Sequence, residues 1–178
     1  LLKWVYDPAL VEPYCQWTGE RAGEAGPMGY LAQGLSEEEK AGSVYDFCAA
    51  SPDFFDMTPR ELADIARQLR FPAEEFYSDR PVASLSGGER IKLQLGRLLF
   101  SRPAALLLDE PSSDLDLETL EWLEDFIGGF PGSVLYISHD ETLIENTATM
   151  VLHIEHPREG KPPRCSVHRL DYSTYISR

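Results

Sequence analysis

Two groups of residues in this sequence have the types and spacing needed for phosphate chemistry. The first is Ser86-Gly87-Gly88, which stands at the start of a segment with helical periodicity. Adjacent glycines let a backbone approach an anion closely, and the first turn of a helix offers free N–H groups and a positive dipole end. Ser86 adds a hydroxyl donor. We interpret these residues as a phosphate-binding turn without a lysine, although a serine-capped glycine turn looks the same in isolation.

The second group is acidic and follows the apolar run of residues 104–108. Asp109 and Glu110 would lie at the carboxyl end of a buried strand, where open α/β sheets bind ligands. There, Asp109 is suited to hold Mg²⁺ through water, and Glu110 to orient or deprotonate an attacking water. His139 ends the next predicted strand at the same sheet edge, from which it could donate a hydrogen bond to a γ-phosphate. The alternative is a set of solvated polar side chains at strand ends.

The elements that would position these residues alternate along the chain. The apolar pattern predicts a helix from about Gly88, a strand at residues 104–108, a helix at about 117–127 and a strand at 133–137. The runs at 104–108 and 133–137 are continuous, as in strands buried on both faces. Strand, helix and strand with short links indicate a mostly parallel α/β sheet with flanking helices.

The rest of the chain carries weaker signals. Residues 28–33 read as a short strand ending in a loop, and residues 34–84 as a small helical insert. Within the insert, Thr58-Pro59-Arg60-Glu61 predicts a helix start with a capping box, Val44 begins a short helix, and residues 36–40 form a charged turn. We expect irregular structure or edge strands in residues 1–26. After about Thr149, we expect one or two strands and a Tyr-rich helix near 172–178.

Taken together, these features resemble the ATP-binding cassette (ABC) ATPases over about residues 28–178. Five motifs in the family's order make chance agreement improbable. They are the Q-loop glutamine Gln33, the signature motif Leu85-Ser86-Gly87-Gly88-Glu89, the Walker B motif Leu106-Leu107-Leu108-Asp109-Glu110, the D-loop aspartate Asp116 and the switch histidine His139.

Within this family the chain looks most like the F subfamily of soluble tandem cassettes that act on the ribosome. The similar segments are residues 115–124, 138–140 and 171–175. Two departures are Ser112-Ser113-Asp114, where the subfamily usually has Thr-Asn-His, and Glu141, where it usually has Arg.

The resemblance implies a site shared between two cassettes, with ATP and Mg²⁺ as cofactors. Glu110 and His139 would be catalytic, and Asp109 and Gln33 would serve the metal. Ser86, Gly87, Gly88 and Glu89 would act on the partner cassette's nucleotide, and Asp116 and Gln33 would also contact nucleotide. The implied output is the closing and opening of two cassettes around ATP, on the ribosome.

The resemblance also implies a phosphate-binding P-loop, and no Gly-x₄-Gly-Lys-Ser/Thr occurs in the 178 residues. Gly29 and Gly34 have the glycine spacing, but Leu35 stands where the lysine must be. We therefore expect a partial P-loop NTPase domain whose P-loop strand and helix lay upstream of Leu1, and which alone does not hydrolyse ATP. Within residues 1–178 we expect the Q-loop strand (28–33), the insert (34–84), a motif-bearing core (85–155) and a tail (156–178).

Composition restricts the class of protein. The net charge of −14 opposes broad contact with nucleic acid through this segment. No apolar run has the length of a membrane span, and no signal peptide opens the chain, so we expect a cytoplasmic protein. The cysteines Cys15, Cys48 and Cys165 are too far apart for a CxxC zinc site.

Three other functions share parts of this pattern. A nucleotide-binding subunit of an ABC transporter would use the same chemistry with a membrane partner. A chromosome-maintenance head would separate P-loop from signature by a coiled coil, but no heptads lie between Gln33 and Ser86. A catalytically inactive module would only complete a partner's site, which the intact Glu110 and His139 oppose.

Overall fold

The computed structural model describes residues 2–7, 9, 26–155 and 164–169. The chain divides into two compact units, Leu1–Ile137 and Ser138–Arg178, which are described separately. The first contains the sheet, the helical insert and most of the predicted site residues.

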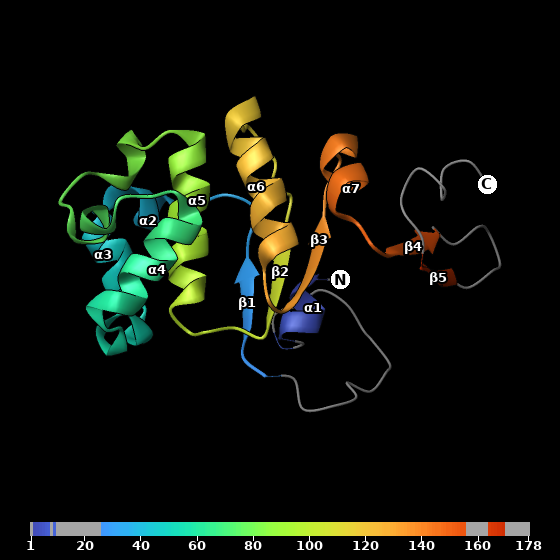
Figure 1. The fold of residues 1–178 in the computed structure, drawn as a ribbon, viewed down its shortest axis with the longest axis horizontal. Helices are drawn as coiled ribbons and strands as arrows, with labels where there is room; N and C mark the ends of the chain where they lie inside the picture. Colours follow the sequence, from blue (N-terminus) through green and yellow to red (C-terminus); the bar gives the residue numbers. More distant parts are fainter. Residues whose placement is uncertain (1, 8, 10–25, 156–163, 170–178) are drawn as a thin grey trace. The chain divides into compact units, whose positions relative to one another are not determined.

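A parallel sheet forms the centre of the first unit (Figure 1). Its strands are β1 (Met28–Leu31), β2 (Ala105–Asp109) and β3 (Ser133–Ile137), in the order β1-β2-β3. The predicted parallel sheet is thus confirmed. In the register, Leu31 pairs with Leu108, and Asp109 pairs with Ile137. The carboxyl ends of all three strands therefore meet at one edge.

Burial differs between the two strands that were expected to be fully buried. In β2, Leu106, Leu107 and Leu108 are all buried, as expected. In β3, Ser133 and Ile137 are exposed and the residues between them are half-buried, so the expectation was wrong for this strand. The reason is its position, because β3 is the last strand on its side of the described sheet and lacks the second neighbour that β2 has.

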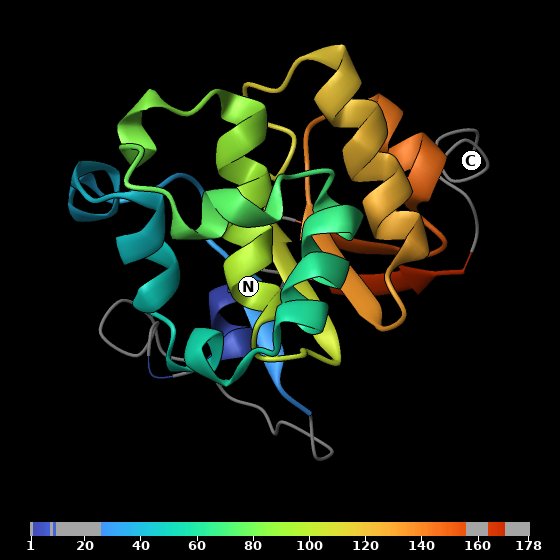
Figure 2. The ribbon, with the colours of Figure 1, turned by 60° about the vertical axis from the view of Figure 1, so that its left-hand side comes forward.

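The two long helices predicted to follow Ser86 and Asp116 are both present. Helix α5 (Gly87–Leu99) packs on β1, and α6 (Leu117–Gly129) runs between β2 and β3 along the chain. Figure 2 shows α5 in front of the sheet, with α4 (Pro59–Leu69) packed against it. Apolar residues at helical spacing bury one side of α5, including Ile91, Leu95 and Leu99.

The helical insert is built from short elements with strong caps. Besides α4 it contains α2 (Glu37–Ala41), α3 (Val44–Ala49) and the 3₁₀ helices η2 (Pro52–Asp56), η3 (Ala73–Tyr77) and η4 (Val82–Ser84). The capping box of Thr58 and Glu61 at the start of α4 is confirmed, with Thr58 N–H donating to Glu61 Oε2 over 2.8 Å. The charged turn predicted at 36–40 was wrong, because Ser36 and Glu39 form a second capping box that starts α2.

The amino-terminal prediction was also wrong where the structure describes it. Residues Leu2–Tyr6 form a short helix, α1, instead of irregular chain or an edge strand. Leu2 is buried, and the Tyr6 ring stacks on Tyr30 of β1 with centroids 5.4 Å apart. Burial of Leu2 and the ring stack of Tyr6 stabilise a segment whose Pro- and Gly-rich surroundings favour irregular chain. Residues 10–25 lie outside the described part.

The second unit starts with a helix that was not predicted. Asp140 caps α7 (Glu141–Thr147), accepting a hydrogen bond from Leu143 N–H over 3.1 Å. After it, β4 (Val151–Glu155) and β5 (Arg164–His168) pair antiparallel, which confirms the strands expected in the tail. The helix predicted at 172–178 lies outside the described residues. None of the described helices is long and apolar enough to cross a membrane.

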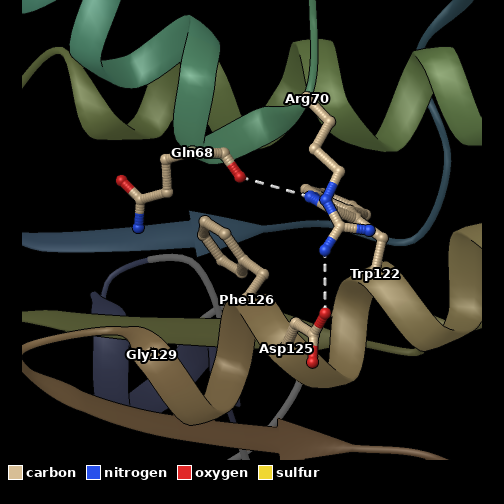
Figure 3. A pocket seen from close by; sticks show the side chains of 6 residues that line it. All are labelled: Gln68, Arg70, Trp122, Asp125, Phe126 and Gly129. Atoms are coloured by element: carbon tan, nitrogen blue, oxygen red, sulfur yellow. Dashed lines mark hydrogen bonds and ion pairs between the residues drawn. The ribbon is translucent and has the colours of Figure 1, made fainter.

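The insert is joined to α6 by polar contacts around a small open pocket (Figure 3). The indole N–H of Trp122 donates to the backbone carbonyl of Gln68 over 3.2 Å. Beside it, Arg70 donates to Asp125 over 2.9 Å. None of the predicted site residues lines this pocket, and the hydrogen bonds beside it join the end of α4 to α6.

Replacing Trp122 with Phe should lower the free energy of unfolding by about 1–3 kcal/mol. The change leaves the Gln68 carbonyl without its donor and opens space around a side chain that is 2% exposed. Urea unfolding measures the loss. The matched control is Arg70→Gln, which removes a neighbouring but exposed ion pair and should cost at most about 1 kcal/mol. Equal effects of the two changes would contradict the importance of the indole contact.

Candidate functional site

The start of α5 carries backbone hydrogen-bond donors next to the exposed Ser86, although Gly88 itself is buried. Ser86 caps the helix, its Oγ accepting from Glu89 N–H over 3.1 Å while Glu89 Oε2 accepts from Ser86 N–H over 2.8 Å. Because Ser86 Oγ already accepts, its hydroxyl hydrogen can point outward. The N–H groups of Gly87 and Gly88 belong to the first helical turn, which has no intrahelical acceptors for them. This turn can therefore bind an anion such as a phosphate.

The two glycines are also required by packing. A Cβ on Gly87 would lie 2.8 Å from the carbonyl oxygen of Asp114. A Cβ on Gly88 would overlap the side chain of Thr119 in α6, with Cγ2 at 3.1 Å and Cβ at 3.2 Å. The glycine pair in the sequence indicates close approach to an anion, but it gives no sign of this packing contact. The phosphate-binding turn is consequently packed directly on the segment that carries Asp116.

That segment is a structured turn between β2 and α6. It begins with Glu110, whose N–H donates to Ile137 O over 2.9 Å and whose φ is +50°. Asp114 has a φ of +61°, an uncommon conformation for a residue other than glycine. The turn ends at Asp116, which caps α6 by accepting from Thr119 N–H over 2.8 Å. Hydrogen bonds from Thr119 hold the pKa of the Asp116 carboxyl below its usual value.

At the end of β2, the carboxylate of Asp109 has a partner that the sequence interpretation missed. The Tyr30 hydroxyl donates to Asp109 Oδ2 over 3.2 Å. Burial, together with the Asp109 carboxylate, raises the pKa of Tyr30 to about 12, so the phenol keeps its proton and remains a donor. Strand register could have indicated this pair, because Tyr30 pairs with Leu107 and Asp109 lies two residues on, on the same face.

The remaining predicted residues follow the two neighbouring strands. Gln33 is exposed, two residues beyond the end of β1, and is followed by Gly34 with a φ of +74°. His139 comes two residues after β3 and belongs to the second unit. The prediction that the strand before His139 lies next to the strand of Asp109 and Glu110 is confirmed. The chemical roles of Gln33 and His139 stay predictions.

The available side chains suit Mg²⁺ bound together with phosphates. Mg²⁺ prefers oxygen ligands and usually keeps several waters, using one or two protein carboxylates. The half-buried carboxylate of Asp109, with the amide oxygen of Gln33, provides this kind of ligand. No cluster of three or more His, Cys, Asp or Glu side chains that could enclose a metal occurs among the described residues.

Comparison with known proteins places these motifs in a family. The family model described as "ABC transporter" matches residues 17–113, which is more than half of the chain. The chain belongs to the ABC transporter family. This match includes Gln33, Ser86, Asp109 and Glu110.

Its curated relatives in this family include members of the F subfamily, which confirms the predicted resemblance. Human ATP-binding cassette sub-family F member 3 is 31% identical over 147 residues, which cover 82% of this chain and 20% of the relative. The energy-dependent translational throttle protein EttA of Mycobacterium tuberculosis is 39% identical over 105 residues, covering 57% of this chain and 17% of EttA. The chain thus spans at most about a fifth of the length of either relative.

The solved structures show the same fold. A chain in a model of ribosome-bound archaeal Pelota and ABCE1 matches with a TM-score of 0.69 over 99% of this chain and 29% of its own length. The sequence identity is 20%, so the likeness concerns the fold alone. The predicted ABC-type α/β fold is confirmed.

Proposed function

We propose that this chain is the signature-bearing part of a cassette that hydrolyses ATP at an interface between two cassettes. The observation that carries the proposal is the donor-rich turn at Ser86, packed against the turn that runs from Glu110 to Asp116. The turn at Ser86 suits recognition of a phosphate. The turn from Glu110 to Asp116 begins with a carboxylate that is suited to act on water. Family membership supports the assignment of both to ATP.

Each side chain has a distinct role in this proposal. The Ser86 hydroxyl and the amides of Gly87 and Gly88 bind the γ-phosphate of the nucleotide held by the partner cassette. Glu110 orients and deprotonates the attacking water at this chain's own site, and His139 donates to the γ-phosphate there. Mg²⁺ bound to Asp109 and Gln33 would neutralise charge on the phosphates. Asp116 holds the start of α6 at the interface.

The 178-residue chain by itself should show no ATP turnover above background. It contains no Gly-x₄-Gly-Lys-Ser/Thr, so the β- and γ-phosphates lack the backbone cradle and lysine that hold them. A phosphate-release assay with Mg²⁺ and ATP measures this, with the Glu110→Gln chain as the blank. Turnover that disappears in the Glu110→Gln chain would overturn the prediction.

We further propose that the whole protein acts on the ribosome in the cytoplasm. The support is similarity to F-subfamily proteins, one of which is named a translational throttle. The test is co-sedimentation of the whole protein, carrying Glu110→Gln, with purified ribosomes in ATP. Binding above that seen without nucleotide is expected. Absence of binding, with recovery of a membrane-protein partner instead, would favour the transporter-subunit alternative that the family's name suggests.

A further inference from the structure

The capping box formed by Ser86 and Glu89 has a third member, Arg80, which lies outside the signature motif. Its guanidinium binds both oxygens of Glu89, with Nη1 2.7 Å from Oε1 and Nη2 3.1 Å from Oε2. A two-point contact of this kind fixes the plane of the carboxylate as well as its position. Arg80 is itself anchored in the insert, since its carbonyl accepts from Val44 N–H over 2.9 Å and its N–H donates to Ser78 Oγ over 3.1 Å.

The contact continues from Arg80 to the phosphate-binding turn. Glu89 Oε2, which accepts from Arg80, also accepts from Ser86 N–H over 2.8 Å. Ser86 Oγ in turn accepts from Glu89 N–H. Glu89 therefore sets the orientation of Ser86, and Arg80 sets the orientation of Glu89.

Charge gives Arg80 a second effect. Hydrogen bonds from Arg80 and from Ser86 hold the pKa of the Glu89 carboxyl below its usual value, so Glu89 is ionised at neutral pH. An ionised carboxylate in the first turn of α5 would repel the phosphates of a nucleotide bound at Ser86. The guanidinium neutralises that charge at contact distance.

We infer that Arg80 is a positioning residue of the proposed ATP site, which orients Ser86 through Glu89 and cancels the Glu89 charge beside the bound phosphates. This inference rests on the proposed function. It adds a residue outside the signature motif, held by the insert, on which the action of Ser86 depends.

The structure supplies a matched control for a test of this inference. The capping box at the start of α4 has a similar construction, with Glu61 bound to Thr58 and, through one carboxylate oxygen, to an arginine, Arg102. Its helix start carries no phosphate-binding turn. Arg102→Gln therefore removes a capping-box arginine without touching the proposed site.

The experiment compares Arg80→Gln, Arg102→Gln and the double variant Arg80→Gln/Glu89→Gln in the whole protein. We expect kcat/KM for ATP to fall about tenfold in Arg80→Gln and less than twofold in Arg102→Gln. The double variant should recover most of the loss, since a glutamine at position 89 keeps an acceptor for Ser86 N–H but carries no charge. The loss in Arg80→Gln should also shrink as salt rises from about 0.05 to 0.5 M.

The outcomes separate this inference from the proposed function. Equal activities of Arg80→Gln and Arg102→Gln would overturn the positioning role, and no recovery in the double variant would overturn the charge-cancelling role. Turnover that persists in Glu110→Gln would instead overturn the proposed function. If Arg80→Gln does not fold, Arg80→Lys tests the positioning role instead. A lysine keeps the positive charge but cannot make the two-point contact with Glu89. A loss of about threefold supports the inference, and wild-type activity in Arg80→Lys contradicts it.

Discussion

Glu110→Gln should lower the rate of ATP hydrolysis by the whole protein by at least about a hundredfold, with little change in nucleotide affinity. Removal of a general base typically costs about 10²–10⁴-fold, and glutamine retains the size of the side chain without its basicity. The backbone of Glu110 is fixed by its hydrogen bond to Ile137 and by its place in the turn before α6. The substitution should therefore leave the fold of the site intact.

Steady-state phosphate release and binding of a fluorescent ATP analogue measure the two quantities separately. Glu118→Gln is the matched control, because Glu118 is an exposed acid in the first turn of α6. It should retain wild-type turnover. Turnover in Glu110→Gln above about a tenth of wild type would assign the activation of water to another residue.

Gly88→Ala should destabilise the protein by about 1–3 kcal/mol and reduce ATP turnover with it. The new methyl group would overlap the hydroxyl and methyl groups of Thr119, so α5 and α6 must separate. The better helix propensity of alanine, worth up to about 1 kcal/mol, offsets part of this cost. Thermal unfolding measures the first effect and phosphate release the second.

Two further variants identify the clash as the cause. Gly88→Ala/Thr119→Ala removes Oγ1 and Cγ2 of Thr119 and should restore most of the lost stability. Gly128→Ala lies in α6, where a Cβ would meet no atom within 4 Å, and should be neutral or slightly stabilising. A Gly88→Ala protein as stable as wild type would show that the two helix starts are not in tight contact in solution.

Elements with strong local signals could be predicted from the sequence. The leucine run of β2 and the capping box of Thr58 and Glu61 specify their structure within a few residues, and both are found where expected. The prediction failed where a distant contact decided the outcome. Helix α1 depends on burial of Leu2 and on the stack of Tyr6 with Tyr30.

The same limit applies to the candidate site. Its motif residues carry types and spacings that are visible in one dimension, as in Ser86-Gly87-Gly88 and Asp109-Glu110. The residues that support them carry no such local pattern. Tyr30, for example, donates to Asp109 across 79 positions of sequence. Arg80 lies nine positions before Glu89, in a connection that the sequence leaves without a defined geometry. For α2 and α7 a local signal is present in the sequence, since Ser36 and Asp140 are residue types that cap helices.

The contact of Gly87 with Asp114 and of Gly88 with Thr119 has a consequence for the timing of the two sites. Because the phosphate-binding turn packs directly on the turn before α6, we expect a partner's nucleotide that draws in Ser86 to displace the chain that follows Glu110 as well. Loss of the γ-phosphate in one site would thus alter the base in the other. We therefore expect the rates of the two hydrolysis events in a pair of cassettes to depend on each other through these two glycine contacts.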